Sequence, residues 1–350
     1  MRKGLSLRFF LFASLLISVS IIGAVLFFTV GQKTWEALKE IQFRYIFLSF
    51  ILGLLANCFD TMRIQTLSQA FGFHLPFWGG LKAILAYNFM ANITPSAMGG
   101  EPVLIYLLIE KTGMDTHKAT AVAIVRGIFL ILIIAIAGPV VLLFHREYLK
   151  TSLMKSLFDY MAILFLVIVG VIIYGFLNLD KLHAMLEKVI GFLFRYRIFQ
   201  RHPSPAVWIR HIYWWMEEFI SSFKYLFQQK KASIVCTGGF TVLSMLANYS
   251  VAYVLLKGLS YDIHFLKVLA IQIVLYFLLY LTPTPGGSGF AEGGFYVLFY
   301  PFVPNHLLGI LLILWRFFIA YLWVLAGWVV IMRGLGIKGL EEIKEKITLA

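Results

Sequence analysis

Charged residues are scarce in this sequence: Asp, Glu, Lys and Arg together make up 13% of its 350 residues. A soluble domain carries about 25%. Hydrophobic residues reach 61%, and the mean hydropathy is +0.86. One aqueous fold cannot bury so much apolar surface, so the composition excludes a soluble globular protein. It indicates a single integral membrane domain over residues 1–350.

Acidic residues are the scarcer charges, with 17 Asp and Glu against 30 Lys and Arg, which gives a net charge of +13. Such a surplus can indicate nucleic-acid binding. Here the basic residues flank apolar segments, where cytoplasmic loops and anionic head groups account for them. We therefore expect membrane lipids as partners, an anionic phospholipid above all, and no nucleic acid. A lipid-modifying enzyme is a further expected partner.

Cysteine is almost absent: Cys58 and Cys236 are the only two, and both lie in apolar stretches. This excludes a disulfide framework and a cysteine metal site. The eight His residues lack zinc-ligand spacing. The glycine-rich run 286–289 is followed by no Lys and preceded by no predicted strand, so it is not a nucleotide-binding loop. We expect no metal, no cofactor and no catalytic residue.

Long apolar runs dominate the chain and predict an all-α, polytopic membrane protein, because lipid admits only helices or closed barrels. Two stretches, 77–111 and 264–300, are interrupted by Pro and Gly. We predict that each forms a re-entrant pair of half-helices, since broken backbone at membrane depth needs protein or a water-filled cavity around it. About six full spans are predicted, at 7–30, 45–68, 119–144, 157–177, 232–257 and 306–332.

The first apolar run, 7–30, follows a basic N-terminus and could be a signal peptide. It is too long for a signal core of about 7–15 residues and lacks a small-residue cleavage site, so we interpret it as a retained span. With a cytoplasmic N-terminus, the inner segments hold 20 Lys and Arg and the outer segments hold 8. This bias predicts a multi-pass protein of the cell inner membrane with both termini in the cytoplasm.

The segment 178–231 mixes aromatic, basic and acidic residues and is predicted to form a cytoplasmic amphipathic connector. Two interpretations remain open for it. Its helices either lie on the membrane surface or are held against the helix bundle.

The chain contains an internal repeat at an offset of about 191 residues. Asn57 falls on Asn248, Glu101 falls on Glu292, and Arg126 falls one residue from Arg316. The repeat halves run from about 45 to 144 and from about 232 to 332. The predicted topology inserts their broken helices from opposite faces, which makes an inverted repeat. This pattern is typical of transporters that alternate access around a site at the membrane midplane.

The two hairpin centres supply the candidate substrate-binding residues. Pro removes backbone donors and Gly permits unusual backbone conformations, so the helices must unwind there. The exposed helix N-termini attract anions such as a phosphate. With the Arg residues of the following spans, the candidates are Asn92, Thr94, Pro95, Gly99, Gly100, Glu101, Arg126, Thr282, Pro283, Pro285, Gly286, Gly287, Gly289, Glu292 and Arg316.

Two acids within the membrane, Glu101 and Glu292, each cost about 2.5–3.5 kcal/mol at a helix centre. They should face a cavity, be protonated or pair with Arg126 or Arg316, and the sequence leaves the pairing open. Functionally, Arg would bind a lipid phosphate and Glu would respond to protons; alternatively, the pairs only set the packing register. Asp60 and Arg63, three residues apart, are predicted to form a surface pair.

These motifs resemble a known family. Asn92-x-Thr-Pro followed by Gly-Gly-Glu101-Pro, and Pro283-x-Pro-Gly-Gly-x-Gly-x-x-Glu292, are similar to the flippase-like lysylphosphatidylglycerol synthase transmembrane region, also called UPF0104. The resemblance spans nearly the whole chain. It implies a helical membrane architecture with re-entrant elements and, in one branch, transfer of lysyl-phosphatidylglycerol between leaflets.

The leading functional prediction is therefore translocation of an anionic phospholipid or related lipid by a flippase-like transporter. In the branch named for the synthase, the membrane region is fused to a cytoplasmic transferase domain. This chain ends about 18 residues after the last predicted span, so we do not expect it to be an enzyme alone. The alternatives are a subunit that presents lipid to a separate transferase, and a lysylphosphatidylglycerol synthase-type or glycolipid transferase.

Overall fold

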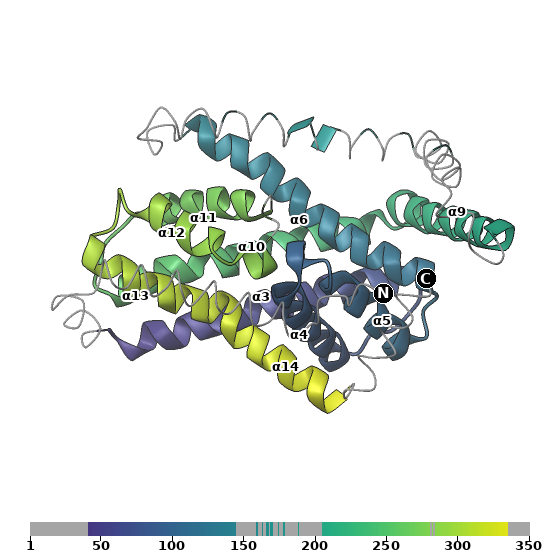
Figure 1. The fold of residues 1–350 in the computed structure, drawn as a ribbon, viewed down its shortest axis with the longest axis horizontal. Helices are drawn as coiled ribbons and strands as arrows, with labels where there is room; N and C mark the ends of the chain where they lie inside the picture. The colour runs from purple at the N-terminus through teal and green to yellow at the C-terminus, as the bar shows by residue number, and fades with distance from the viewer. Residues whose placement is uncertain are drawn as a thin grey trace, which may run out of the picture.

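A computed structural model describes residues 41–144 and 205–334, apart from Leu281 and Pro283, together with isolated residues between 159 and 188. All regular structure in these ranges is helical (Figure 1). The prediction of an all-α membrane protein is confirmed.

The described helices fall into two groups with the same order: a long helix, a pair of short helices separated by a 3₁₀ turn, and a second long helical segment. The first group is α3 (Phe43–Ala70), α4 (Phe77–Ile93), η1 (Pro95–Ala97), α5 (Gly100–Thr112) and α6 (Thr116–Phe144). After α9 (Pro205–Gln229), the second group is α10 (Lys231–Gly258), α11 (Phe265–Tyr280), η4 (Pro285–Gly287), α12 (Phe290–Phe299), α13 (Asn305–Arg316), the π-helical turn η5 (Phe317–Tyr321) and α14 (Leu322–Gly334).

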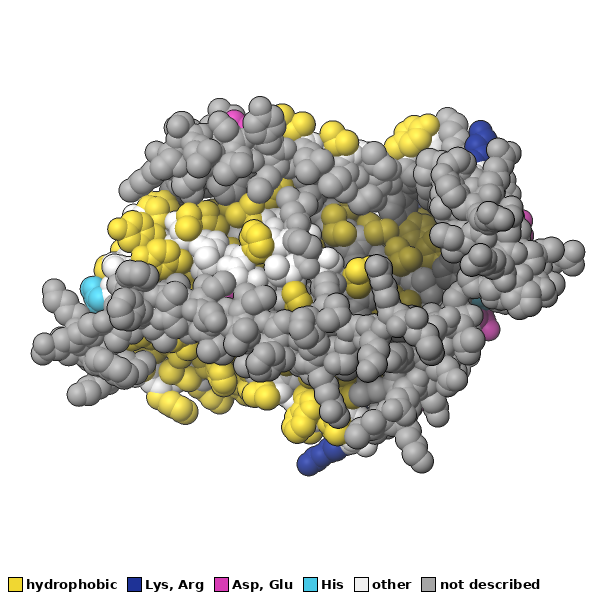
Figure 2. Space-filling view, in the orientation of Figure 1, with side chains coloured by type: hydrophobic (Ala, Val, Ile, Leu, Met, Phe, Trp, Pro, Cys, Tyr) yellow, Lys and Arg dark blue, Asp and Glu magenta, His cyan; other side chains and the backbone are white. Residues whose placement is uncertain are grey.

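Four described helical segments are long and apolar enough to cross a membrane: Phe43–Ala70, Thr116–Ile134, Lys231–Gly258 and Asn305–Arg333. They coincide with four of the six predicted spans. The other two predictions, 7–30 and 157–177, lie outside the described residues except for isolated positions. Figure 2 shows hydrophobic side chains over much of the described part of the visible face, with the few charged side chains at its margins. That distribution suits a lipid-facing surface.

Both stretches predicted to be broken do form two short helices around a 3₁₀ turn. In the first, a Cβ atom added to Gly100 would lie 2.7 Å from the ring of Tyr87, so α5 folds back along α4. In the second, a Cβ atom on Gly294 would lie 3.0 Å from Leu275, so α12 folds back along α11. The chain therefore reverses direction at each turn, as a re-entrant hairpin requires.

The two halves run in opposite directions. In the middle of α3, Phe59 stacks on Phe240 of α10 with ring centroids 6.4 Å apart. Near the start of α3, Gly258 backs onto Tyr45, whose Cβ would lie 2.8 Å from an added Cβ atom. Low numbers in α3 thus meet high numbers in α10, and the helices are antiparallel. This arrangement is what an inverted repeat requires.

The halves are also interleaved. Helix α4 of the first half packs on α14 of the second, and α11 of the second half packs on α6 of the first. The α4–α14 crossing is close enough that a Cβ atom on Gly327 would lie 2.1 Å from the carbonyl oxygen of Leu85. Helices α4 and α11, the first helix of each broken pair, therefore each pack on an element of the other half.

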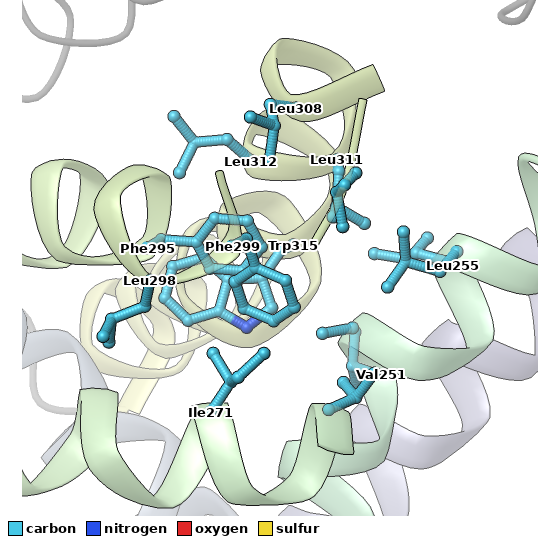
Figure 3. Packing of buried hydrophobic residues seen from close by; sticks show 14 of the residues in the cluster. Val251, Leu255, Ile271, Phe295, Leu298, Phe299, Leu308, Leu311, Leu312 and Trp315 are labelled. Atoms are coloured by element: carbon cyan, nitrogen blue, oxygen red, sulfur yellow. The ribbon is translucent and has the colours of Figure 1, made fainter. Parts of the chain in front are cut away.

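Aromatic packing fixes the second hairpin in place. Phe295 of α12 stacks on Phe299 at 4.3 Å and on Trp315 of α13 at 4.5 Å between ring centroids. Figure 3 shows these rings enclosed by aliphatic side chains that include Ile271 and Val251. Glu292 lies one helical turn before Phe295, and Arg316 directly follows Trp315. The hydrophobic core thus positions both charged residues.

Of the predicted connector, residues 178–204 lie outside the described ranges apart from two isolated residues. Helix α9 forms most of the remainder. Its Ile220, Phe223 and Leu226 are buried, and the latter two belong to the hydrophobic cluster of the first half. Helix α9 also packs on α6 and α10. The described helix of the connector is thus held against the bundle.

Candidate functional site

The two 3₁₀ turns have the same backbone conformation. Pro95 begins η1 and Pro285 begins η4. The two residues after the proline have φ angles of 52° and 57° in η1, and of 57° and 67° in η4. In η1 these are Ser and Ala, for which positive φ is unfavourable, whereas η4 uses two glycines. The turns therefore align at an offset of 190, one less than the offset that joins Glu101 to Glu292.

The tips of the two hairpins touch. Turn η4 contacts both η1 and the end of α4. A Cβ atom on Gly286 would lie 2.8 Å from Oδ1 and 2.9 Å from the backbone oxygen of Asn92. Glycine is required here both for its φ angle and for this close approach. The broken backbones of the two halves thus meet at Asn92 and Gly286.

The first-half site consists of Asp60, Arg63, Glu101 and Arg126. Arg126 binds Asp60 with two hydrogen bonds, Nε to Oδ1 at 2.9 Å and Nη2 to Oδ2 at 2.6 Å. Arg63 donates from Nη1 to the same Oδ1 at 2.8 Å. The remaining Nη1 of Arg126 lies 3.5 Å from Oε1 of Glu101. Two guanidinium groups and two carboxylates leave this buried cluster with no net charge, as low-dielectric surroundings favour.

Two tyrosines, one from each half, interact with the guanidinium of Arg126. Its Cζ atom lies 4.1 Å from the ring centroid of Tyr87, a cation–π contact. Tyr280, at the end of α11, interacts electrostatically with Arg126 and Arg63. Arg63 also donates from Nη2 to the backbone oxygen of Arg126 at 2.5 Å, which joins α3 to α6. The site therefore lies where α3, α4, α6 and the second-half helix α11 meet.

The second-half site consists of Glu292, Arg316 and the backbone of η4. Arg316 donates from Nε to Oε1 of Glu292 at 2.8 Å and from Nη2 to the carbonyl oxygen of Gly286 at 3.1 Å. The other carboxylate oxygen, Oε2, accepts the backbone N–H of Gly289 at 2.7 Å. Glu292 is 0% and Arg316 4% exposed. Both oxygens of this acid are engaged, and the ion pair holds the turn closed.

The two hairpins use different residues to cap the helix after the turn. In the second, Glu292 accepts the N–H of Gly289. In the first, the hydroxyl of Thr94 accepts the N–H of Gly99 at 2.9 Å and donates to the carbonyl of Met90 at 2.7 Å. Thr284 occupies the position equivalent to Thr94, but its buried hydroxyl has no partner among the described residues. Because Thr94 caps its helix, Glu101 is not needed for capping.

A row of asparagines connects the first-half site to the hairpin tips. Asn57, one turn before Asp60, accepts a hydrogen bond from Nδ2 of Asn88 at 2.7 Å. Asn92 in turn donates to the backbone oxygen of Asn88 at 2.8 Å and lies against Gly286. Gly286 accepts from Arg316. Polar groups therefore run from one charged site to the other through the interior of the bundle.

The structure answers the pairing question that the sequence left open: Glu101 and Glu292 each contact the Arg of their own half. The prediction that Asp60 and Arg63 form a surface pair is wrong. They do pair, but they are only 8% and 2% exposed, because both lie on the buried face of α3 and Arg126 reaches across to the same carboxylate.

The other candidate residues lie mostly at the turns. Gly99 and Gly100 pack against Thr94 and Tyr87, and Thr282 donates to the carbonyl of Leu279 at 2.8 Å. Pro283 lies outside the described residues, and the backbone of Pro95 starts η1.

Sequence reasoning missed four residues at the first-half site: Asp60, Arg63, Tyr87 and Tyr280. A signal was present for the first two, because ionisable residues inside an apolar span favour a functional position over a surface one. The two tyrosines lie in apolar helices with nothing in the sequence to distinguish them. Among the described residues, no group of three His, Cys, Asp or Glu could hold a metal ion.

Comparisons with known proteins agree with this architecture. The chain is similar to a UPF0104 membrane protein of Archaeoglobus fulgidus, with 24% identity over 306 residues that cover 86% of this chain and 90% of the relative. It is also similar to a UPF0104 membrane protein of Methanocaldococcus jannaschii, with 23% identity over 284 residues, or 79% of this chain and 81% of the relative. A family model described as the lysylphosphatidylglycerol synthase TM region matches residues 11–327 of this chain. The chain therefore belongs to the lysylphosphatidylglycerol synthase transmembrane-region family, as its hairpin motifs predicted.

Proposed function

We propose that this membrane protein moves an anionic lipid, such as an anionic phospholipid, between the two leaflets. The observation that supports this most directly is the meeting of two broken helices at Asn92 and Gly286, each with an acid and an Arg beside its break. Buried charges in lipid are expensive, and those in membrane spans most often mark a substrate pathway. An antiparallel pair of halves also provides two related conformations, open to opposite faces.

In this proposal the head group travels along the polar interior and the acyl chains remain in the bilayer. Arg126 is the residue that binds the phosphate, because a guanidinium matches phosphate oxygens in charge and geometry. The asparagine row between Asp60 and Gly286 offers amide groups to the remaining polar atoms of the head group. We further propose that the protein lies in the cell membrane with both termini in the cytoplasm, as the distribution of Lys and Arg predicts.

Reconstitution tests the proposal. Purified protein is placed in phosphatidylcholine liposomes that contain a trace of phosphatidylglycerol labelled with a fluorophore that dithionite quenches. Dithionite is then added outside the liposomes. If the protein moves this lipid, dithionite quenches inner-leaflet fluorophores as well. Arg126→Lys should slow this phase by about tenfold, because it loses a charge-assisted hydrogen bond worth about 1.5 kcal/mol or more.

Lys118→Gln is the matched control, since Lys118 pairs with Asp115, lies over the ring of Phe73 and takes no part in either charged site, and the side chains of Lys118 and Asp115 are partly exposed. Its rate should equal that of the unsubstituted protein. Quenching no faster than in protein-free liposomes, from correctly folded protein, would refute lipid translocation.

A second candidate is a membrane subunit that presents lipid to a separate transferase, and the family description, which names the membrane region of a synthase, favours it. The same site would then bind the head group without moving it across. Affinity purification should recover a lipid-modifying enzyme in fixed stoichiometry, and the purified chain alone should bind phosphatidylglycerol but leave dithionite quenching unchanged.

A further inference from the structure

The two acids of the repeat differ in how completely they are bound. Glu292 is fully buried, and each of its carboxylate oxygens has a hydrogen-bond partner at 2.8 Å or less. The side chain of Glu101 is 39% exposed, and its Oε1 lies 3.5 Å from Arg126, beyond a strong charge-assisted hydrogen bond. Its Oε2 is buried and has no hydrogen-bond partner among the described residues. Glu101 is therefore the acid that is free to change its state.

Arg126 is arranged so that it can lose Glu101 and keep its place. Its Nε and Nη2 are both held by Asp60, while Tyr87 lies beneath its plane. Its Nη1 points toward Glu101 and is the one nitrogen of this guanidinium that Asp60 does not bind. A ligand that replaces the carboxylate of Glu101 at Nη1 would meet a donor already fixed in position, at little cost in side-chain order.

The charge balance of the first-half site couples the binding of an anionic ligand to the protonation of Glu101. With Asp60 and Glu101 ionised, the cluster is neutral and offers an anion no net attraction. A proton on Glu101 leaves the two guanidinium groups opposed by Asp60 alone, so the cluster gains one positive charge. A monoanionic phosphate then restores neutrality, which buried charges strongly favour. Two ligands that each improve binding of the other are linked by thermodynamic necessity.

We propose that the first-half site binds one proton together with one monoanionic phosphate head group, with the proton on Glu101 and the phosphate on Nη1 of Arg126. The proton comes from water and converts the carboxylate to an acid, whose O–H then donates to a phosphate oxygen. No other bond is made or broken. This proposal rests on the proposed function of moving an anionic lipid and specifies it as electroneutral co-transport of lipid and proton.

Other charged groups near Glu101 do not compete for this proton. Arg126 from α6 and the Asp60–Arg63 pair from α3 interact electrostatically with it, and Tyr87 from α4 has a side-chain hydrogen-bond interaction with its carboxylate. Asp60 accepts three hydrogen bonds from two guanidinium groups, so it stays ionised. Arginine stays protonated throughout the accessible range of pH.

Proton uptake on lipid binding tests the proposal with the unsubstituted protein. Purified protein in weakly buffered detergent solution receives phosphatidylglycerol, and a pH-sensitive dye reports proton uptake while a separate assay counts bound lipid. We expect about one proton for each phosphatidylglycerol at alkaline pH and none for zwitterionic phosphatidylcholine. The apparent affinity of the protein for phosphatidylglycerol should fall about tenfold per pH unit once the pH is high enough to ionise Glu101 in the lipid-free protein. This is the slope for one linked proton.

Substitutions then assign the proton to one acid. Glu101→Gln, which resembles the protonated state, should bind phosphatidylglycerol independently of pH and take up no proton. Glu101→Asp should retain the pH dependence of phosphatidylglycerol binding. If the Glu101→Gln variant does not fold, the Glu101→Asp variant is used in its place. Glu110→Gln is the matched control, because Glu110 lies on the same helix, is 40% exposed and pairs with Lys111. It should behave as the unsubstituted protein does.

The outcomes separate this proposal from the function on which it rests. If phosphatidylglycerol binds and crosses the bilayer without proton uptake, or if Glu101→Gln keeps the original pH dependence, the co-binding proposal is wrong and lipid translocation stands. If the lipid neither binds nor moves, both proposals fail.

Discussion

The first-half and second-half sites contain the same kinds of residues but differ in how completely their charges are paired. At the second-half site, one carboxylate and one guanidinium satisfy each other and the broken backbone of η4. At the first-half site, Asp60 holds two guanidinium groups, which leaves Glu101 at the edge with a buried, unpartnered oxygen among the described residues. A repeated sequence motif therefore does not imply a repeated set of contacts. One copy stabilises the turn, and the other retains a buried carboxylate oxygen without a partner among the described residues.

The largest expected effect comes from removing the acid that has no counterpart in the second half. Asp60→Asn would leave Arg63 and Arg126 buried with only Glu101 to oppose them. Breaking a buried ion pair costs about 3–5 kcal/mol, and here two pairs share one carboxylate. We expect the variant to be poorly folded in detergent, measured by thermal unfolding and by size-exclusion elution.

The control for this substitution is Asp115→Asn, which removes a 55% exposed acid paired with Lys118. It should cost less than about 1 kcal/mol, as exposed ion pairs do. Equal stability losses for the two variants would show that the Asp60 cluster is not the main ionic support of the first half.

The comparison between the two glutamates predicts an unequal pair of effects. Glu292→Gln leaves Arg316 buried without a counterion and weakens the cap on Gly289, at a cost of about 3 kcal/mol or more. Glu101→Gln leaves Arg126 bound to Asp60 and should cost about 1 kcal/mol or less. Thermal unfolding of both variants in one detergent measures the difference. Similar losses for both, or a larger loss for Glu101→Gln, would contradict the distinction drawn between the sites.

The smallest expected effect lies in the two threonines that precede the turns. Thr94→Val removes a hydroxyl that makes two hydrogen bonds and should cost about 1–2 kcal/mol. Thr284→Val removes a buried hydroxyl without a described partner and should be neutral or slightly stabilising. A pair of unfolding curves decides the matter. A destabilised Thr284→Val variant would mean that this hydroxyl has a partner in the folded protein.

The hairpins show how far the sequence leads. Pro and Gly at 95–100 and 283–289 predicted two broken helices, because these residues, when clustered within a few positions, destabilise a helix and favour a turn. The pairing of Glu101 with Arg126 and of Glu292 with Arg316 could not be predicted, since each pair joins different helices whose approach depends on packing. The burial of Asp60 and Arg63 was missed for the same reason: spacing along one helix does not reveal a third partner on another.

By itself, the sequence determined that this is a helical membrane protein with two interrupted helices and an acid beside each, because apolar run length, proline and glycine act locally. The tertiary structure alone decided which acid became saturated. A one-residue shift places Glu292 where it can cap its own turn, while Thr94 caps the other. Asp60 of α3 accepts two hydrogen bonds from Arg126, which leaves Glu101 with the weaker contact at 3.5 Å. Which buried charges pair depends on how helices far apart in the sequence pack together, and residue spacing along the chain does not show this.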